Sequence, residues 1–366
     1  EDLTIFRNII QHCGLQMPAE IPAQLTNEIA FGGIVLGDTV NARIQENRVE
    51  DNGKVTGKPV CGVYLRYGEQ IEISGNTIIR NGLPLVTRDQ TVQRGVRAGI
   101  MIRMGFKTAD LKNVLTSTVP SFDGVPAISI HDNVVEQPLG HALYGTAFGP
   151  VSVVNNQFTS LGADRTNPQS TLASTVFLFD LGVSKDFVVT MIKSMANKSP
   201  AANQQYLNDP AARQLVTGLQ YLPSGKLIFS DNQVTLDMRS PAINLSVSSI
   251  LVLSLDDIAF NNNQSECAGY LSLVANDISF DLVILNSLII GASVRTNDNR
   301  FMEGVTLALY SLLSYGLMNT ALGNQSTHCL LTLGTLRSVA DNLVLNSALC
   351  NDKQLQYAKA LSVPMG

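Results

Sequence analysis

Short runs of alternating apolar and polar residues recur along the chain, and each run ends at a pair of polar residues. In Ile71–Ile78, Ile128–Val135 and Leu227–Val234, an alternating start is followed by a polar pair that ends in Asn, then by one further residue and an apolar residue. Alternation with a period of two places every second side chain on one side of a strand. The pattern therefore predicts short strands that are separated by sharp bends.

The Asn or Asp at the bend marks a repeat. These residues are Asn47, Asn76, Asn133, Asn156, Asn232, Asp257, Asp277, Asn299 and Asn342. Five of the eight intervals between them span 20 to 29 residues, and the others span 43, 57 and 76 residues. A period of this size is typical of a solenoid, and the longer intervals fit two coils or a coil with an insertion. Stacked coils would bury a continuous apolar column.

These units resemble those of the right-handed parallel β-helix, or pectin-lyase-like, superfamily. The resemblance covers roughly residues 30–350, with interruptions. It implies an all-β fold, a right-handed winding, and an inward ladder of asparagines at the sharp turn. It says little about activity, because this scaffold carries many functions.

The pattern predicts five parts of the chain. They are an N-terminal cap with the first coil (1–40), β-helix coils (41–162), an insertion (163–225), further coils (226–350) and a C-terminal tail or cap (351–366).

Helices are expected only outside the regular coils. Residues 4–13 fit a short capping helix, and residues 184–196 and 209–218 fit a helical hairpin in the insertion, with Ser184 and Asp209 as N-caps. A short terminal helix is expected at 352–361, whereas residues 304–323 fit either a wide coil or a buried helix.

Composition narrows the class of protein. Only 15% of the 366 residues are charged, 45% are hydrophobic and the net charge is −5, which excludes intrinsic disorder. A sequence pI near 5.4 argues against nucleic-acid binding. The most apolar stretch, Phe280–Val294, contains Asp281 and is too short to span a bilayer. The five dispersed cysteines indicate buried free thiols, although one long-range disulfide stays open.

Two groups of residues are candidates for a site. Arg94, Arg97, Arg103 and Lys107 form the most basic stretch, which is either an ordinary coil with a long loop or a surface for an acidic glycan or a protein. His131, Asp132 and His141 form a loose cluster, which is either turn hydrogen bonding with a surface imidazole or a catalytic or metal-binding group. The chain lacks phosphate-binding, serine-hydrolase and zinc-protease motifs, so no cofactor and no metal are expected.

Two functions fit these observations. The first is a non-catalytic β-helix, a rigid structural or binding module that presents loops to a protein or glycan in a larger secreted or phage-tail-like assembly. The alternative is a polysaccharide lyase or glycoside hydrolase that acts on an acidic glycan; a hydrolase needs two carboxylates facing one sugar bond.

Further expectations concern the chain's context. It begins with Glu1, which suggests a processed chain or a piece of a longer one, and a secreted or particle-associated setting is favoured. The apolar stretches 245–255 and 280–294 are either core strands or part of an interface in a homo-oligomer.

Overall fold

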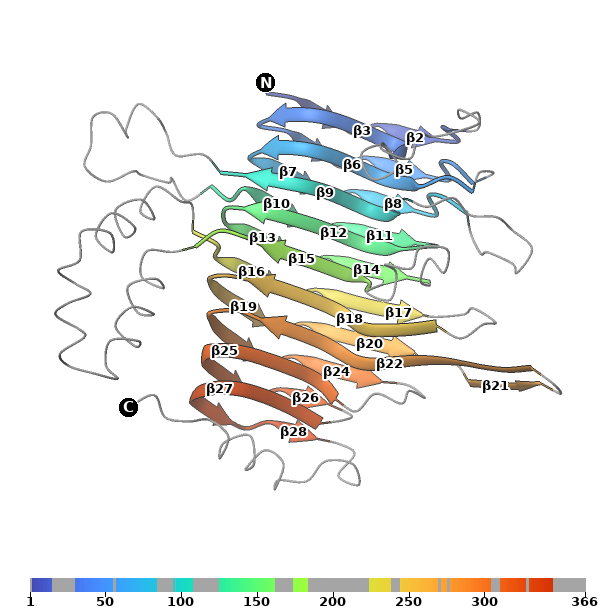
Figure 1. Ribbon diagram of the computed structural model, residues 1–366. Coiled ribbons are helices and arrows are strands. Elements are labelled where there is room, and N and C mark those ends of the chain that lie inside the picture. Colours follow the sequence, from blue (N-terminus) through green and yellow to red (C-terminus); the bar gives the residue numbers. More distant parts are fainter. Residues whose placement is uncertain are drawn as a thin grey trace, which may run out of the picture.

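The protein is a right-handed parallel β-helix, as the sequence predicts (Figure 1). The computed structural model describes residues 2–14, 30–54, 57–83, 95, 97–107, 125–161, 174–183, 224–237, 244–268, 271–274, 277–303, 310–326 and 329–344. No α-helix occurs in these ranges. Arg94 and the helices predicted at 184–196, 209–218 and 352–361 lie outside them.

A regular coil carries three strands, and equivalent strands of successive coils pair in parallel. The long sheet contains β3 (Phe31–Val40), β6 (Val60–Glu69), β9 (Ala98–Phe106), β12 (His141–Phe148), β15 (Val176–Asp180), β18 (Asn244–Ser254), β22 (Asp277–Ile290), β25 (Tyr310–Leu322) and β27 (Cys329–Ala340). The middle sheet contains β1 (Thr4–Phe6), β4 (Arg43–Gln45), β7 (Ile71–Ser74), β10 (Ile128–His131), β13 (Val151–Val154), β16 (Leu227–Ser230), β19 (Asp257–Asn261) and β23 (Ser293–Asn297).

The third sheet has ten strands within the described residues. They are β2 (Ile9–Gln11), β5 (Arg48–Glu50), β8 (Thr77–Ile79), β11 (Val134–Gln137), β14 (Gln157–Ser160), β17 (Gln233–Asp237), β20 (Gln264–Ala268), β24 (Arg300–Glu303), β26 (Gln325–Ser326) and β28 (Leu343–Val344). A short strand, β21 (Leu271–Val274), forms an antiparallel hairpin with the start of β22. Strand β25 pairs with both β22 and β23, so the long and middle sheets are continuous there.

The core is a column of apolar side chains from all three sheets. One cluster of buried residues runs from Ile34 to Leu330 and includes Ile73, Ile130 and Phe260. The rings of Phe229 and Phe260 stack with centroids 5.2 Å apart, and Phe301 continues the stack at 6.4 Å. Because each strand buries every second residue, the opposite residues point outward and are free to vary.

A ladder of asparagines lies at the corner between the middle and third sheets, as expected. The side-chain amide and the backbone N–H of each asparagine both donate to the side-chain oxygen of the asparagine in the next coil. The ladder runs through Asn8, Asn47, Asn76, Asn133, Asn156, Asn232, Asn263, Asn299, Asn324 and Asn342.

Asp257 and Asp277, which the sequence placed in the ladder, do not belong to it. The ladder passes from Asn232 to Asn263 and on to Asn299, whereas Asp257 begins β19 and Asp277 begins β22. An ionised carboxylate accepts hydrogen bonds but has none to donate. An aspartate therefore cannot donate the side-chain hydrogen bond that links each ladder residue to the next coil.

The left-handed backbone conformation at this corner belongs to the residue before each ladder asparagine. These residues are Arg7, Glu46, Gly75, Asp132, Asn155, Asp231, Asn262, Asp298, Gly323 and Asp341, with φ between 52° and 64°. Asn, Asp and Gly adopt this region most readily. The two residues of the polar pair thus have different roles: the first adopts the left-handed conformation that turns the chain, and the second forms the hydrogen bonds of the ladder.

The regular coils extend further than predicted. The segment expected to form a capping helix contains β1 and β2, which pair with β4 and β5; Ile5 and Ile10 pack against the core on either side of the corner. Inside the predicted insertion, β15 pairs with β12 and β18 as part of the long sheet. Residues 310–322 form β25, which is a strand of a wide coil and not a helix.

Candidate functional site

The polar side chains that gather most closely lie on the outside of the middle sheet. Strands β7 and β10 bury their isoleucines and turn Glu72 and Ser129 outward. Their parallel register sets Ser129 beside Glu72 and His131 beside Ser74. Glu72 therefore lies diagonally across the sheet from His131, within reach of its side chain.

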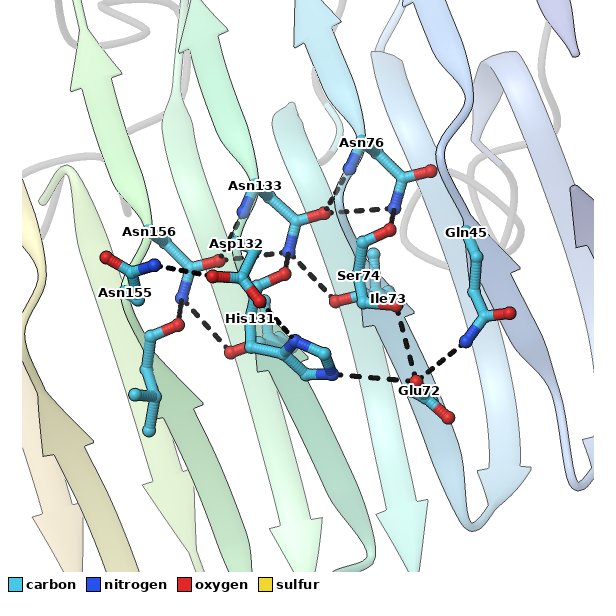
Figure 2. A network of polar contacts seen from close by, with 12 residues as sticks. Gln45, Glu72, Ile73, Ser74, Asn76, His131, Asp132, Asn133, Asn155 and Asn156 are labelled. Atoms are coloured by element: carbon cyan, nitrogen blue, oxygen red, sulfur yellow. Dashed lines mark hydrogen bonds and ion pairs between the residues drawn. The ribbon is translucent and has the colours of Figure 1, made fainter. Parts of the chain in front are cut away.

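His131 is held between two carboxylates (Figure 2). Its Nδ1 lies 2.8 Å from Asp132 Oδ2, and its Nε2 lies 3.5 Å from Glu72 Oε1. About a third of the imidazole side chain is exposed. A carboxylate oxygen therefore faces each ring nitrogen.

Glu72 has further partners in the same network. Gln45 Nε2 donates to Glu72 Oε1 at 2.7 Å, and the Ser74 hydroxyl donates to the same oxygen at 3.3 Å (Figure 2). Arg43 Nε lies 3.9 Å from Glu72 Oε2. The network thus spans three coils, from β4 through β7 to β10, and its carboxylates are already paired within the protein.

Asp132 joins this network to the corner of the helix. It has a left-handed backbone with φ of 58° and accepts a hydrogen bond from the amide of Asn155 in the next coil. The bond from His131, and then the bond from Asn155, hold the pKa of the Asp132 carboxyl below its usual value. Asp132 therefore stays ionised in mildly acidic solution.

An open groove of about 200 Å³ follows the corner from Asp132 into the next two coils. Its lining residues are Asp132, Asn133, Val134, Asn155, Asn156, Gln157, Asp231 and Gln233. Asn133 and Asn156 are buried ladder residues, whereas the other six are exposed. The groove therefore presents carboxylates from Asp132 and Asp231 and amides from Asn155, Gln157 and Gln233, repeated at the strand spacing of about 4.8 Å.

His141 does not join His131 and Asp132. It begins β12 in the long sheet, where its Nδ1 lies 2.6 Å from the Ser174 carbonyl oxygen and its ring lies near Tyr144 and Phe177. Burial lowers the pKa of His141 to about 4, against the opposing effect of the Ser174 carbonyl. The sequence brought these histidines together only because they are close along the chain.

The predicted basic surface is also absent from the described residues. Arg97 and Lys107 are buried, with 5% and 3% of their surface exposed, and the Arg97 guanidinium donates to the carbonyls of Gly95 and Gly57. Arg103 is half-buried on the long sheet. Arg97 lies just before β9 and Lys107 just after it, so both lie at the ends of this long strand.

Two buried carboxylates lie at another corner, between the long and middle sheets. Asp180 Oδ1 accepts the backbone N–H of Gly182, and Asp256 Oδ2 accepts that of Gly225. Gly182 and Gly225 are in close contact, since a Cβ on Gly225 would lie 2.1 Å from the Gly182 oxygen. Burial, with a contribution from the charge of Asp256, raises the pKa of Asp180 to about 8.

Across the described ranges, no three His, Cys, Asp or Glu side chains gather as a metal would require. No helix among the described residues has the length and apolar character needed to cross a bilayer. Cys13, Cys61 and Cys267 are not joined in disulfides.

Comparisons with protein-family models, with curated proteins and with solved structures found no match.

Sequence reasoning missed Glu72 and Gln45, the partners that complete the His131 network. Glu72 occupies the second position of Ile71–Ile78, as Ser129 does in Ile128–Val135. Aligning the units coil by coil would therefore have placed Glu72 one strand away from His131.

Proposed function

We propose that this chain is a non-catalytic β-helix binding module whose corner groove holds a hydroxyl-rich ligand of the glycan class. The observation that carries the proposal is the groove itself, in which three successive coils present carboxylate and amide groups. A sugar hydroxyl both donates and accepts hydrogen bonds, and carboxylate and amide groups together meet both needs. The stacked coils hold these groups in place before a ligand arrives, which lowers the entropic cost of binding.

The charge of the groove favours a neutral or basic glycan over an acidic one. Asp132 and Asp231 line it, and Asp132 keeps its charge because of its hydrogen bonds to His131 and Asn155. The basic residues that would have met an acidic glycan are buried at Arg97 and Lys107. An acidic polymer would therefore be repelled at this corner.

The same geometry argues against a hydrolase or a lyase. Glu72 and Asp132 face each other across the His131 ring, so the imidazole fills the space that a glycosidic bond would need between two catalytic carboxylates. A lyase that uses Arg or Lys as its base would need one at the groove, and neither residue lines it.

We infer that the relationship of this chain is with the pectin-lyase-like superfamily. The inward asparagine ladder and the right-handed winding support this inference. In that setting the module would act as a rigid part of a larger assembly, presenting its groove and loops to a partner.

The test is binding of the full chain to a panel of neutral, basic and acidic polysaccharides, measured by affinity electrophoresis and calorimetry. We expect binding to a neutral or basic polymer and a dissociation constant raised about 10-fold or more in the Gln157→Ala, Gln233→Ala double variant. Gln325→Ala is the matched control, since Gln325 occupies the same outward row outside the groove. Absence of binding across the panel would refute the proposal, and so would release of shorter oligosaccharides.

A further inference from the structure

The N-terminal end of the β-helix presents three strand edges. Within the described residues, β1, β2 and β3 each pair on one side only, with β4, β5 and β6 of the next coil. Figure 1 shows β2 and β3 at this end of the stack, beyond β5 and β6. Half of the backbone N–H and C=O groups of an edge strand point away from its one partner. These three edges therefore offer backbone hydrogen bonds to a further coil.

The apolar column is also incomplete at this end. Ile5, Ile10 and Leu36 pack against the core but stay partly exposed. The residues at the same register positions in the next coil are 0% exposed: Ile44, Val49 and Leu65. Inside a solenoid, the adjoining coil covers such side chains. The first coil has the inward residues of a coil that lies inside a stack, without the cover.

The asparagine ladder ends here at an acceptor. The backbone N–H and the side-chain amide of Asn8 donate to Asn47 Oδ1, at 2.9 and 3.1 Å, and Asn47 donates in the same way to Asn76 Oδ1. Each Oδ1 thus accepts two hydrogen bonds from the coil before it. Among the described residues no donor reaches Asn8 Oδ1. Asn8 is exposed, whereas Asn47 and Asn76 are buried, so Asn8 Oδ1 can accept two hydrogen bonds from outside.

Asp2 has the backbone of a corner that follows a long-sheet strand. In the next two coils this corner residue is Asn41, directly after β3, and Gln70, directly after β6. The three residues have φ of 51°, 54° and 54°. Each donates its backbone N–H to the last residue of a long-sheet strand in the following coil: Val40, Glu69 and Phe106. The chain that leads into Asp2 therefore arrives along the free edge of β3.

We propose that the stretch of the natural chain that leads into Asp2 forms a further coil, which stacks on β1, β2 and β3. Its middle, third and long strands follow one another in that order, because the coil must end in the strand before the Asp2 corner. It carries apolar residues at alternate positions, which cover the end of the column. It also carries an asparagine between its middle and third strands, whose amide and backbone N–H donate to Asn8 Oδ1.

Other occupants would satisfy only part of this end. A capping helix would cover the apolar residues, but its own backbone groups bond within the helix and leave the three strand edges unpaired. A single extended strand from a partner would pair with one edge and leave the other two. A coil meets the three edges, the column and the Asn8 acceptor together. For this reason the proposal commits to a coil.

The probe for the experiment is a synthetic peptide of Arg43–Glu69, which holds the middle, third and long strands of one coil in the required order and includes Asn47. Because the coils repeat, a segment that stacks on one coil should fit the equivalent edge of another. The peptide is titrated into the full chain under reducing conditions, with calorimetry and amide hydrogen exchange as readouts. We expect binding and slower exchange in β1, β2 and β3, and neither with a peptide of scrambled sequence.

Asn8→Ala should weaken the association of the peptide about 10-fold, because it removes the acceptor of two hydrogen bonds. Thr4→Ala is the matched control, since Thr4 lies on the same edge with an exposed side chain, and it should bind like the wild type. Thermal melting checks that both variants fold. A peptide that carries Asn47→Ala should also bind more weakly, which tests the same bond from the other side if Asn8→Ala fails to fold.

The source of the coil is tested on the protein purified from its natural source, by intact mass and N-terminal sequencing. We expect residues before Glu1 with alternating apolar positions and a corner asparagine. A natural chain that starts at Glu1 would overturn the proposal. So would failure of the coil peptide to bind, equal binding of the scrambled peptide, or protection of only one of the three edge strands. The glycan groove lies in later coils, from Asp132 to Gln233, so either proposal can fail without the other.

Discussion

Replacing one asparagine inside the ladder tests how the coils are held together. Asn133 Oδ1 accepts the backbone N–H and the side-chain amide of Asn76, both at 2.9 Å. Its own amide donates to the carbonyls of Ile73 and His131 and to Asn156 Oδ1, at 2.8 to 2.9 Å. Asn133 is 1% exposed, so water cannot replace these bonds.

The cost of Asn133→Ala follows from what it leaves unpaired. The Asn76 side-chain amide keeps its bonds to Ile44 and Ser74, whereas the buried Asn76 backbone N–H loses its acceptor. An orphaned buried donor costs about 1 to 3 kcal/mol, and the lost hydrogen bonds add about 1 kcal/mol. We expect Asn133→Ala to lower the free energy of unfolding by about 2 to 4 kcal/mol.

Chemical denaturation measures this loss, and hydrogen exchange locates it. Because coils unfold in part independently of one another, exchange at the Asn76 amide should accelerate more than exchange in distant coils. Asn155→Gly is the control, since Asn155 is exposed and glycine accepts its left-handed backbone. If Asn133→Ala denatures at the same midpoint as Asn155→Gly, the ladder does not stabilise the fold and the reasoning is wrong.

Three other expectations follow from buried groups. The Asp180 carboxyl has a pKa of about 8 in the folded chain and about 3.9 when unfolded, so the free energy of unfolding should fall as pH rises from about 4 to 8. Asp180→Asn should remove this pH dependence and raise the free energy of unfolding at pH 7 by on the order of 4 kcal/mol, as measured by urea denaturation across pH. Phe260→Ala should cost about 3 to 5 kcal/mol, read from the denaturation midpoint, because it opens a cavity in the ring stack of the core. Burial raises the pKa of Cys61 to about 12, so a thiol reagent should label exposed Cys13 in the native protein and Cys61 only after unfolding.

The sequence predicts the fold well because every coil of a β-helix needs the same kinds of residue at the same positions. The apolar positions and the corner asparagine recur in every coil, and both follow from local chemistry: alternation for the strands and amide bonding for the corner. The three ladder positions that it missed, Asn8, Asn263 and Asn324, have the same amide role as the others. Asn263 was missed because Asp257 and Asp277 were accepted as equivalents of asparagine, and Asn8 because its segment was expected to form a capping helix. Asn324 lies in the 43-residue interval between Asn299 and Asn342, where no bend residue was assigned.

The candidate site was predictable only in part. His131 and Asp132 are adjacent in the chain, so their contact was visible in the sequence. The contact of His131 with Glu72 depends on the register between β7 and β10, and strands β8 and β9 lie between these two strands in the chain. The burial of Arg97 and Lys107 depends on how the rest of the chain packs around the two ends of β9, which composition does not reveal.

The apolar stretches at 245–255 and 280–294 show how a strand can carry apolar residues on both of its faces. In β18, Ile250 and Val252 point into the core, whereas Leu251 and Leu253 do not belong to it. A strand that is apolar on both faces loses its alternation, and its sequence then resembles a fully buried strand.

The division between inner and outer positions explains where function can reside in this fold. The inner residues and the ladder asparagine have the same packing and hydrogen-bonding roles in every coil, so a change at any of them lowers the free energy of unfolding. The outer residues have no such shared role, so each face can acquire its own chemistry: paired charges across β4, β7 and β10 and a polar groove at the corner. Substitutions at outer positions should therefore alter binding or association while leaving the unfolding midpoint nearly unchanged, and substitutions at inner positions should do the reverse.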